Sequence, residues 1–256
     1  MAKFARGELM SFNLQIRLFQ LFVQLMGIYS LYYMGVTGDY FWLLVVVPAY
    51  ILLGPIGIGL VLHRLLTHRT FTTHKWLENL LSFLSVFCTL GPTITWVGLH
   101  RYHHANSDTE LDPHSPKHGK FRAWTGIGWT IPQIPLRYVK DLMKNPFQRF
   151  ILDHYFKILI SAILLITIIN PVLVLFLYFL PCALAFHGVN AINVFGHTSG
   201  YRNYNTDDNS TNNLIVHFLT WDCLHNNHHA NPGDWNNKHN WWELDPLGSI
   251  IQLIRK

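Results

Sequence analysis

The stretch ILDHYFKILISAILLITIINPVLVLFLYFLPCALAFHGVNAINVF, which covers residues 151–195, decides the fold. It is far longer than the roughly 20 residues that one helix needs to cross a bilayer. Its middle carries Asn170-Pro171, a dipeptide that signals a turn. We therefore predict two antiparallel membrane-spanning helices, a short one over 152–169 and a second over 172–195, hinged at this turn.

Two more apolar stretches precede this block, over 14–36 and 40–62. The first is weakened by three polar residues but stays long enough to span a bilayer. Half of the 256 residues are hydrophobic and only 13% are charged, whereas ordinary soluble domains carry about 25% charged residues. We predict one all-α, integral-membrane domain over 1–256, with four transmembrane helices arranged as two hairpins. The short polar segment Met1–Phe12 does not resemble a signal peptide.

A fifth apolar stretch, Leu77–Val97, is predicted not to cross the membrane. It contains Gly91-Pro92, which breaks a helix. It also lies between two histidine clusters that would end on opposite faces of the bilayer if it crossed once. We expect it to lie in the plane of the membrane or against the bundle.

The charges predict the orientation. Lys and Arg are concentrated between His63 and Phe150, and the short links at 37–39 and 170–171 carry none. The positive-inside rule then places 63–151, 196–256 and both termini in the cytoplasm. The amphipathic run Leu136–Phe150 is expected on the membrane surface.

The sequence has 16 histidines, and several of them fall into three tight clusters. The clusters are His63-Arg-Leu-Leu-Thr-His68, His100-Arg-Tyr-His103-His104 and His225-Asn-Asn-His228-His229. Helical positions i, i+3 and i+4 share one face, so the second and third clusters each present three imidazoles together. His63 and His68 lie about 140° apart on an ideal α-helix. They suit a helix end, or two ligands that reach different metal ions.

Four crossings would bring all three clusters to one membrane face, which indicates a metal site. Imidazole binds Fe, Zn, Cu and Ni. The three cysteines, Cys88, Cys182 and Cys223, are too scattered for a zinc knuckle or a disulfide framework and are expected to be packed thiols.

The order and flanks of the clusters resemble the integral-membrane fatty acid desaturases. The segments that carry the resemblance are Gly57–Phe71, Trp96–His104 with Asp112-Pro113-His114, Asn193 to Arg202, and His225–Ala230 followed by Trp241–Asp245. The resemblance implies a cytoplasmic helical cap that holds a di-iron site (Fe²⁺/Fe³⁺). Its implied iron ligands are His63, His68, His100, His103, His104, His197, His225, His228 and His229.

The resemblance also implies supporting residues and a branch of the family. Asn193 matches a position that holds an iron-bound water. Three aspartates are candidates to orient ligand imidazoles, namely Asp108, Asp112 and Asp222. Gly98-Leu99 stand where animal acyl-CoA enzymes have Arg and Asp, so the chain leans towards the bacterial and cyanobacterial branch, in which glycerolipid-linked acyl chains are also used.

The implied reaction is O₂-dependent insertion of a cis double bond, at Δ9 by default, into an acyl-lipid or acyl-CoA chain. O₂ is the co-substrate, and electrons come from a separate ferredoxin or b-type cytochrome with its reductase. No nucleic acid partner is expected. Two other readings stay open: a di-iron hydroxylase or ketolase of a lipid or terpenoid, and a metal transporter or sensor.

Overall fold

The computed structural model describes residues 6–127 and 133–256. The start of the polar segment expected in the cytoplasm, at residues 1–5, lies outside these ranges. The described chain is helical and has no extended strand. The helices of four turns or more and the longer π-helical segment are α1 (Arg6–Thr37), η2 (Leu52–Thr67), α7 (Pro146–Ile169) and α8 (Leu180–Phe195). The shorter helices are α2 (Leu43–Ile51), α3 (Lys75–Ser85), α4 (Thr93–Ala105), α5 (Lys120–Thr125), α6 (Lys140–Lys144), α9 (Leu214–Thr220), α10 (His225–Ala230) and α11 (Pro246–Ile254).

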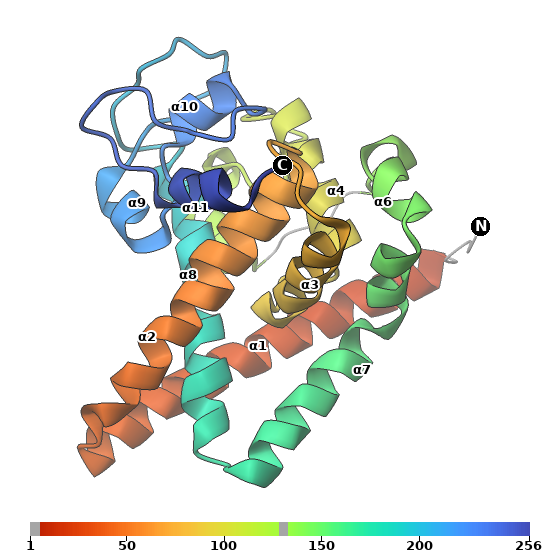
Figure 1. Ribbon diagram of the computed structural model, residues 1–256, viewed down its shortest axis with the longest axis vertical. Helices are drawn as coiled ribbons and strands as arrows, with labels where there is room; N and C mark the ends of the chain where they lie inside the picture. The colour runs from red at the N-terminus through yellow and green to blue at the C-terminus, as the bar shows by residue number, and fades with distance from the viewer. Residues whose placement is uncertain (1–5, 128–132) are drawn as a thin grey trace.

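Four helical segments are long and apolar enough to cross a membrane, which confirms the predicted number. They cover Leu14–Thr37, Tyr40–Thr67, Pro146–Ile169 and Leu175–Phe195. In Figure 1 they form the long lower part of the molecule, whereas α9, α10 and α11 gather at one end. We call that end, residues 196–256, the cap.

The hinge of the second hairpin lies where the sequence places it. Asn170 ends α7, and its side-chain oxygen accepts hydrogen bonds from the backbone N–H groups of Val172 and Leu173. α7 is longer than predicted, because Asn145 caps it at Phe147 and Pro146 suits the first turn of a helix.

The amphipathic run Leu136–Phe150 is not one surface helix. It is divided into the short turn Leu136–Tyr138, α6 and the first turn of α7. Asn145-Pro146 separates the last two pieces, because the residue before a proline is driven out of the helical conformation.

The second span continues beyond its predicted end at residue 62. After α2 it winds as the π-helical segment η2, in which hydrogen bonds join residues five apart. Pro48 and Pro55 lie inside this span, and a proline cannot supply the N–H of an α-helical bond. The continuous helix carries His63 into the cap end of the molecule.

The apolar stretch Leu77–Val97 is sharply bent. Lys75–Cys88 and Thr93–Ala105 meet at 83°, and the break between them holds Thr89 and Gly91 with positive φ. His68, before this segment, and His100, near its end, have ring centroids 5.4 Å apart. The two ends of the segment therefore lie close together, which is compatible with the prediction that it makes no net crossing.

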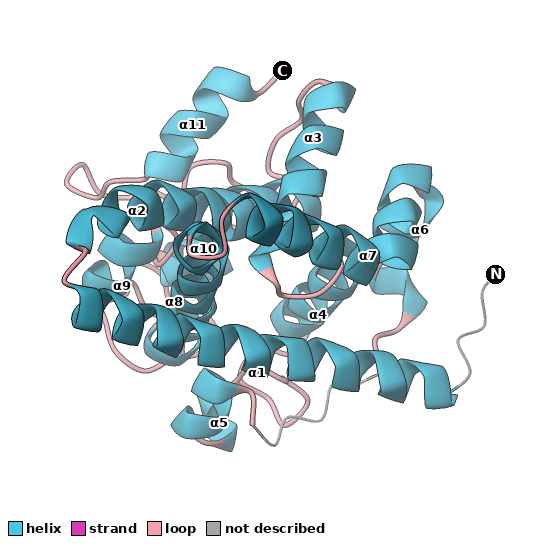
Figure 2. Cartoon of the chain, turned by 90° about the horizontal axis from the view of Figure 1, so that it is seen from below, coloured by secondary structure: helices cyan, strands magenta, loops and turns pink. Residues whose placement is uncertain are grey.

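Helix α8 packs against α1 and against the second span, α2 and η2. Gly27 of α1 packs so closely on α8 that a Cβ atom there would lie 2.6 Å from Cβ of Ala183. Figure 2, which views the molecule from below, shows α1 passing across one side. Helix α5 packs on α8. At the cap, buried Leu247 and Ile251 of α11 pack with Leu62 and Leu65 of η2, so the C-terminal tail is held against the second span.

Candidate metal centre

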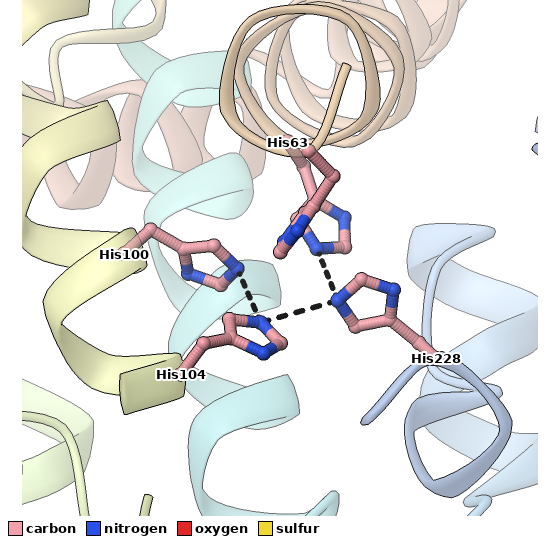
Figure 3. A group of neighbouring side chains, drawn as sticks. His63, His100, His104 and His228 are labelled. Atoms are coloured by element: carbon pink, nitrogen blue, oxygen red, sulfur yellow. Dashed lines mark hydrogen bonds between the residues drawn. The ribbon is translucent and has the colours of Figure 1, made fainter. Parts of the chain in front are cut away.

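All nine histidines named from the sequence as ligands lie together at the cap end of the bundle. They form two groups in which the candidate ligand atoms lie within 4.8 Å of one another. One group contains His63, His68, His100, His104 and His228, and the other contains His103, His197, His225 and His229. Figure 3 shows four rings of the first group pointing toward one another from separate parts of the chain.

Each His-x-x-His-His cluster divides between the two groups. In α4, His100 and His104 join the first group and His103 joins the second. In the third cluster the middle histidine, His228, joins the first group, and the two outer ones, His225 and His229, join the second. The groups adjoin, with ring centroids of His104 and His229 4.4 Å apart.

The open question about His63 and His68 is settled by the π-helical winding of η2. Both rings belong to one group, with centroids 4.9 Å apart. The backbone N–H of His68 bonds to the carbonyl of His63, five residues earlier. A turn of this width brings residues five apart closer to one face than the roughly 140° of an α-helix.

Four of the rings are oriented by carboxylates through their Nδ1 atoms. The distances are 2.5 Å for His63–Asp222, 2.8 Å for His103–Asp112, 2.9 Å for His197–Asp108 and 2.5 Å for His229–Asp208. An ionised carboxylate can only accept a hydrogen bond, so each Nδ1 carries the proton. Each Nε2 then keeps a lone pair, which is the arrangement found around metal-bound histidines.

The carboxylates are held in their ionised form. Burial opposes ionisation of Asp108, but the hydrogen bond with His197 outweighs it and lowers the pKa of Asp108 to about 2. The pKa values of Asp112 and Asp208 are also lowered despite burial, by His103 and His229 respectively. All three therefore accept hydrogen bonds at neutral pH.

The three aspartates named from the sequence each contact the site, and the sequence reasoning missed a fourth, Asp208. Asp108 and Asp112 meet His197 and His103, and Asp222 meets His63. Asp208 lies in a polar loop beside the exposed Asp207. In the sequence, only its carboxylate marks it as a possible partner of a histidine. Nothing in its spacing from His229 distinguishes it.

Several of the imidazoles are held in the neutral form that binds metal ions. Burial, followed by the neighbouring rings, lowers the pKa of His68, His100 and His104 well below the usual value of histidine. In the same way burial lowers the pKa of His229 to about 4. A protonated ring could not bind a metal, so this environment favours binding.

The described residues fit a metal ion better than an empty polar core. Nε2 of His68, His103 and His229 is buried and has no hydrogen-bond partner in the described chain. Such orphaned polar atoms are uncommon in folded proteins. Nε2 of His63 lies 2.9 Å from Nε2 of His228, and Nε2 of His197 lies 2.9 Å from Nε2 of His225. Metal–imidazole bonds of about 2.0–2.1 Å, as for zinc, allow one ion to hold such a pair.

An apolar cavity of about 620 Å³ adjoins the histidines. His63, His100 and His225 line it beside Asn193, and its other walls come from α1, α2, α4 and α8. Asn193 is buried at the cap end of α8, four residues before His197. A cavity of this size and character suits an apolar small molecule.

Comparison with known proteins identifies the family. The family described as "Fatty acid desaturase" matches residues 40–252. The chain is 36% identical to the sn-1 stearoyl-lipid 9-desaturase of Anabaena variabilis, with 80% of this chain and 78% of the relative covered. It is 36% identical to the sn-2 palmitoyl-lipid 9-desaturase of Nostoc sp. (strain 36), with 80% and 75% covered, and 34% identical to the acyl-CoA C20 Delta5-desaturase of Anemone leveillei, with 84% and 70% covered.

This chain belongs to the fatty acid desaturase family. It is therefore an oxidoreductase, and the family matches the expectation drawn from the histidine clusters. The desaturase family is generally di-iron, and the two histidine groups are compatible with that cofactor. Among the curated relatives, both lipid-linked and CoA-linked enzymes occur.

Other histidines of the desaturase have structural contacts. His217 is held at both ring nitrogens, since Nε2 lies 2.6 Å from the carbonyl of Leu244 and Nδ1 accepts from the backbone N–H of Cys223. His187 accepts a hydrogen bond from the indole N–H of Trp124 and lines the cavity. The three cysteines are free and buried, as the sequence suggested.

Proposed function

We propose that this desaturase uses O₂ to insert a cis double bond, at the Δ9 position, into the acyl chain of a membrane lipid. The observation that carries the proposal is the cluster of nine histidines, three of which line one apolar cavity. The lipid and the position are supported by the cyanobacterial relatives, which are named as stearoyl- and palmitoyl-lipid 9-desaturases.

Two iron ions, one in each histidine group, are the proposed cofactor. His63, His68, His100, His104 and His228 would hold one ion, and His103, His197, His225 and His229 would hold the other, with Asn193 supporting the site through a water. Bound iron would activate O₂, because breaking an unactivated C–H bond requires a strong oxidant.

The chain's own side chains set the geometry of the reaction. Asp222, Asp112, Asp108 and Asp208 hold the imidazoles in the tautomer that leaves Nε2 free. The apolar cavity receives the acyl chain and keeps bulk water from the site. Fixing a methylene pair beside the rings then determines which carbons lose hydrogen.

Lipid-linked substrate is favoured over a thioester by α4. Gly98 packs against Val139 and Ile134 so closely that its Cβ would lie 2.7 Å from Val139 Cγ1. Gly98-Leu99 offers no cationic side chain for a CoA phosphate, whereas animal acyl-CoA enzymes are expected to have an Arg, followed by an Asp, at these places. An acyl-CoA substrate remains the alternative that product analysis separates.

The metal centre, the cap and both termini are proposed to be cytoplasmic, following the concentration of Lys and Arg in 63–151. Electrons are proposed to come from a separate donor protein, a ferredoxin or a b-type cytochrome with its reductase. The Lys and Arg residues of 63–151 would suit an acidic donor.

The decisive experiment is expression in a host that lacks its own desaturase, followed by mass spectrometry and double-bond mapping of each lipid class. The proposal predicts monounsaturated chains, two hydrogens lighter, with the bond at Δ9 in glycerolipids. Hydroxy or keto products would instead support the hydroxylase reading. The absence of any product from iron-loaded protein in the membrane would contradict the proposal.

Matched histidine variants separate the site from general damage. His103→Ala and His228→Ala should abolish product, whereas His154→Ala, at a half-buried position of α7 outside both histidine groups, should leave it unchanged. Membrane content of each variant is measured by immunoblotting. Full activity of His103→Ala would contradict the ligand assignment.

A further inference from the structure

Helix α9, which lies outside the four spans, presents large apolar side chains away from the protein. Ile215 and Phe218 are 78% and 81% exposed, and Leu214 and Leu219 are also exposed. Val216, His217 and Thr220 face inward and are buried. The helix cannot roll to hide its apolar face, because His217 is bonded at both ring nitrogens.

The exposed face of α9 continues onto the C-terminal tail. The carbonyl of Leu244 lies 2.6 Å from Nε2 of His217, so the tail lies directly against α9. Leu244 and its neighbour Trp241 are 74% and 87% exposed. We call these six side chains the α9 patch: Leu214, Ile215, Phe218, Leu219, Trp241 and Leu244. Adjoining exposed apolar groups of this kind mark an interaction surface.

Two contacts fix the level of α9 along the spans. The hydroxyl of Tyr50, in the second span, donates to the carbonyl of Leu219 over 2.9 Å. Cγ2 of Thr220 lies 3.3 Å from the position of a Cβ on Gly188. Gly188 is seven residues before the end of α8, or about 10 Å along a helix axis. The C-terminal end of α9 therefore lies beside the body of α8, about two turns before the cap end of that helix.

The patch also lies beside two of the apolar segments that are long enough to span a membrane. α9 packs on α8 and on η2, and α8 exposes Leu184 and Phe195 on its own surface. We propose that the α9 patch is embedded in the bilayer leaflet on the side of the metal centre, at the boundary between headgroups and acyl chains. Amphipathic helices bury their apolar face about 5–10 Å into this boundary, and tryptophan is enriched there.

Embedding α9 has a consequence for the histidines. Thr220 ends the helix and lines the cavity, and Asp222 and His225 follow within five residues. The bilayer would thus hold the segment that leads into the third histidine cluster. The inference rests on the four-span topology and does not depend on the reaction that the enzyme catalyses.

The test uses single cysteines labelled with the environment-sensitive fluorophore NBD, in the full-length protein reconstituted into phosphatidylcholine vesicles. The native Cys88, Cys182 and Cys223 are buried, so introduced surface cysteines label selectively. The test sites are Phe218→Cys and Ile215→Cys, two independent variants in case one folds poorly. Leu44→Cys, exposed on the second span, is the lipid reference, and Lys238→Cys is the aqueous reference.

Each sample is quenched separately with a doxyl-labelled phosphatidylcholine and with aqueous iodide. The inference predicts that labels at 218 and 215 behave like the label at 44, with strong quenching by the lipid and weak quenching by iodide. Quenching like that at 238 would overturn it. Protection from both quenchers that disappears on dilution would also overturn it, because a second copy of the chain would then cover the patch.

Discussion

Nδ1 of His63 lies 2.5 Å from Oδ2 of Asp222, although 159 residues separate them in the chain. The other carboxylate oxygen of Asp222 accepts from Arg64, whose guanidinium also binds Asp245 at 2.7 Å. One buried network thus joins the second span, the segment before the third histidine cluster and the C-terminal tail. The position of the His63 ring therefore depends on all three segments.

We predict that Arg64→Met destabilises the whole cap. The change leaves Asp222 and Asp245 buried without their cation, and breaking a buried pair typically costs about 3–5 kcal/mol. The thermal midpoint of the detergent-purified protein should fall by several degrees, with loss of iron. Arg137→Met, at an exposed position, should shift it little. An unchanged midpoint for Arg64→Met would show that the network does not stabilise the fold.

Asp208→Asn should weaken iron binding and activity by about 10–100-fold, the usual cost of removing an orienting partner of a metal-bound histidine. The adjacent Asp207→Asn is the matched control, because Asp207 is exposed. Iron per chain is measured by mass spectrometry of metals, and product by gas chromatography. Equal values for the two variants would remove Asp208 from the site.

Gly54→Leu should shorten the cavity and shift the product towards shorter acyl chains. A Cβ on Gly54 lies 3.3 Å from the ring of Tyr50 and 3.6 Å from Cβ of Ala185, so a larger side chain must project into the cavity that these residues line. Gly35→Leu is the control, since a Cβ there meets nothing within 4 Å. The ratio of C16 to C18 monounsaturated products reports the shift, and an unchanged ratio would place the acyl chain elsewhere.

His103→Ala and His104→Ala should damage different halves of the metal centre, even though the residues are adjacent. His103 belongs to the group of four and His104 to the group of five. Mössbauer spectra of the ⁵⁷Fe-loaded variants should lose different components. Identical spectra would indicate that the two groups do not bind separate ions.

The sequence was sufficient for the number of spans, the hinge at Asn170-Pro171 and the set of clustered histidines. Apolar length and turn chemistry act locally, so a single chain reveals them. The winding of η2 was not predictable, because the position of His68 beside His63 depends on a π-helical turn rather than on spacing in an ideal α-helix. Asp208 was missed because a loop carries it to His229 through tertiary contacts alone. The division of each cluster between two groups likewise arises from how three separate segments face one another.

X-ray diffraction from crystals of the iron-loaded protein, recorded above and below the iron absorption edge, tests the central claim most directly. The account predicts two iron peaks, one surrounded by His63, His68, His100, His104 and His228 and the other by His103, His197, His225 and His229. A single peak, or iron bound away from these imidazoles, would contradict it.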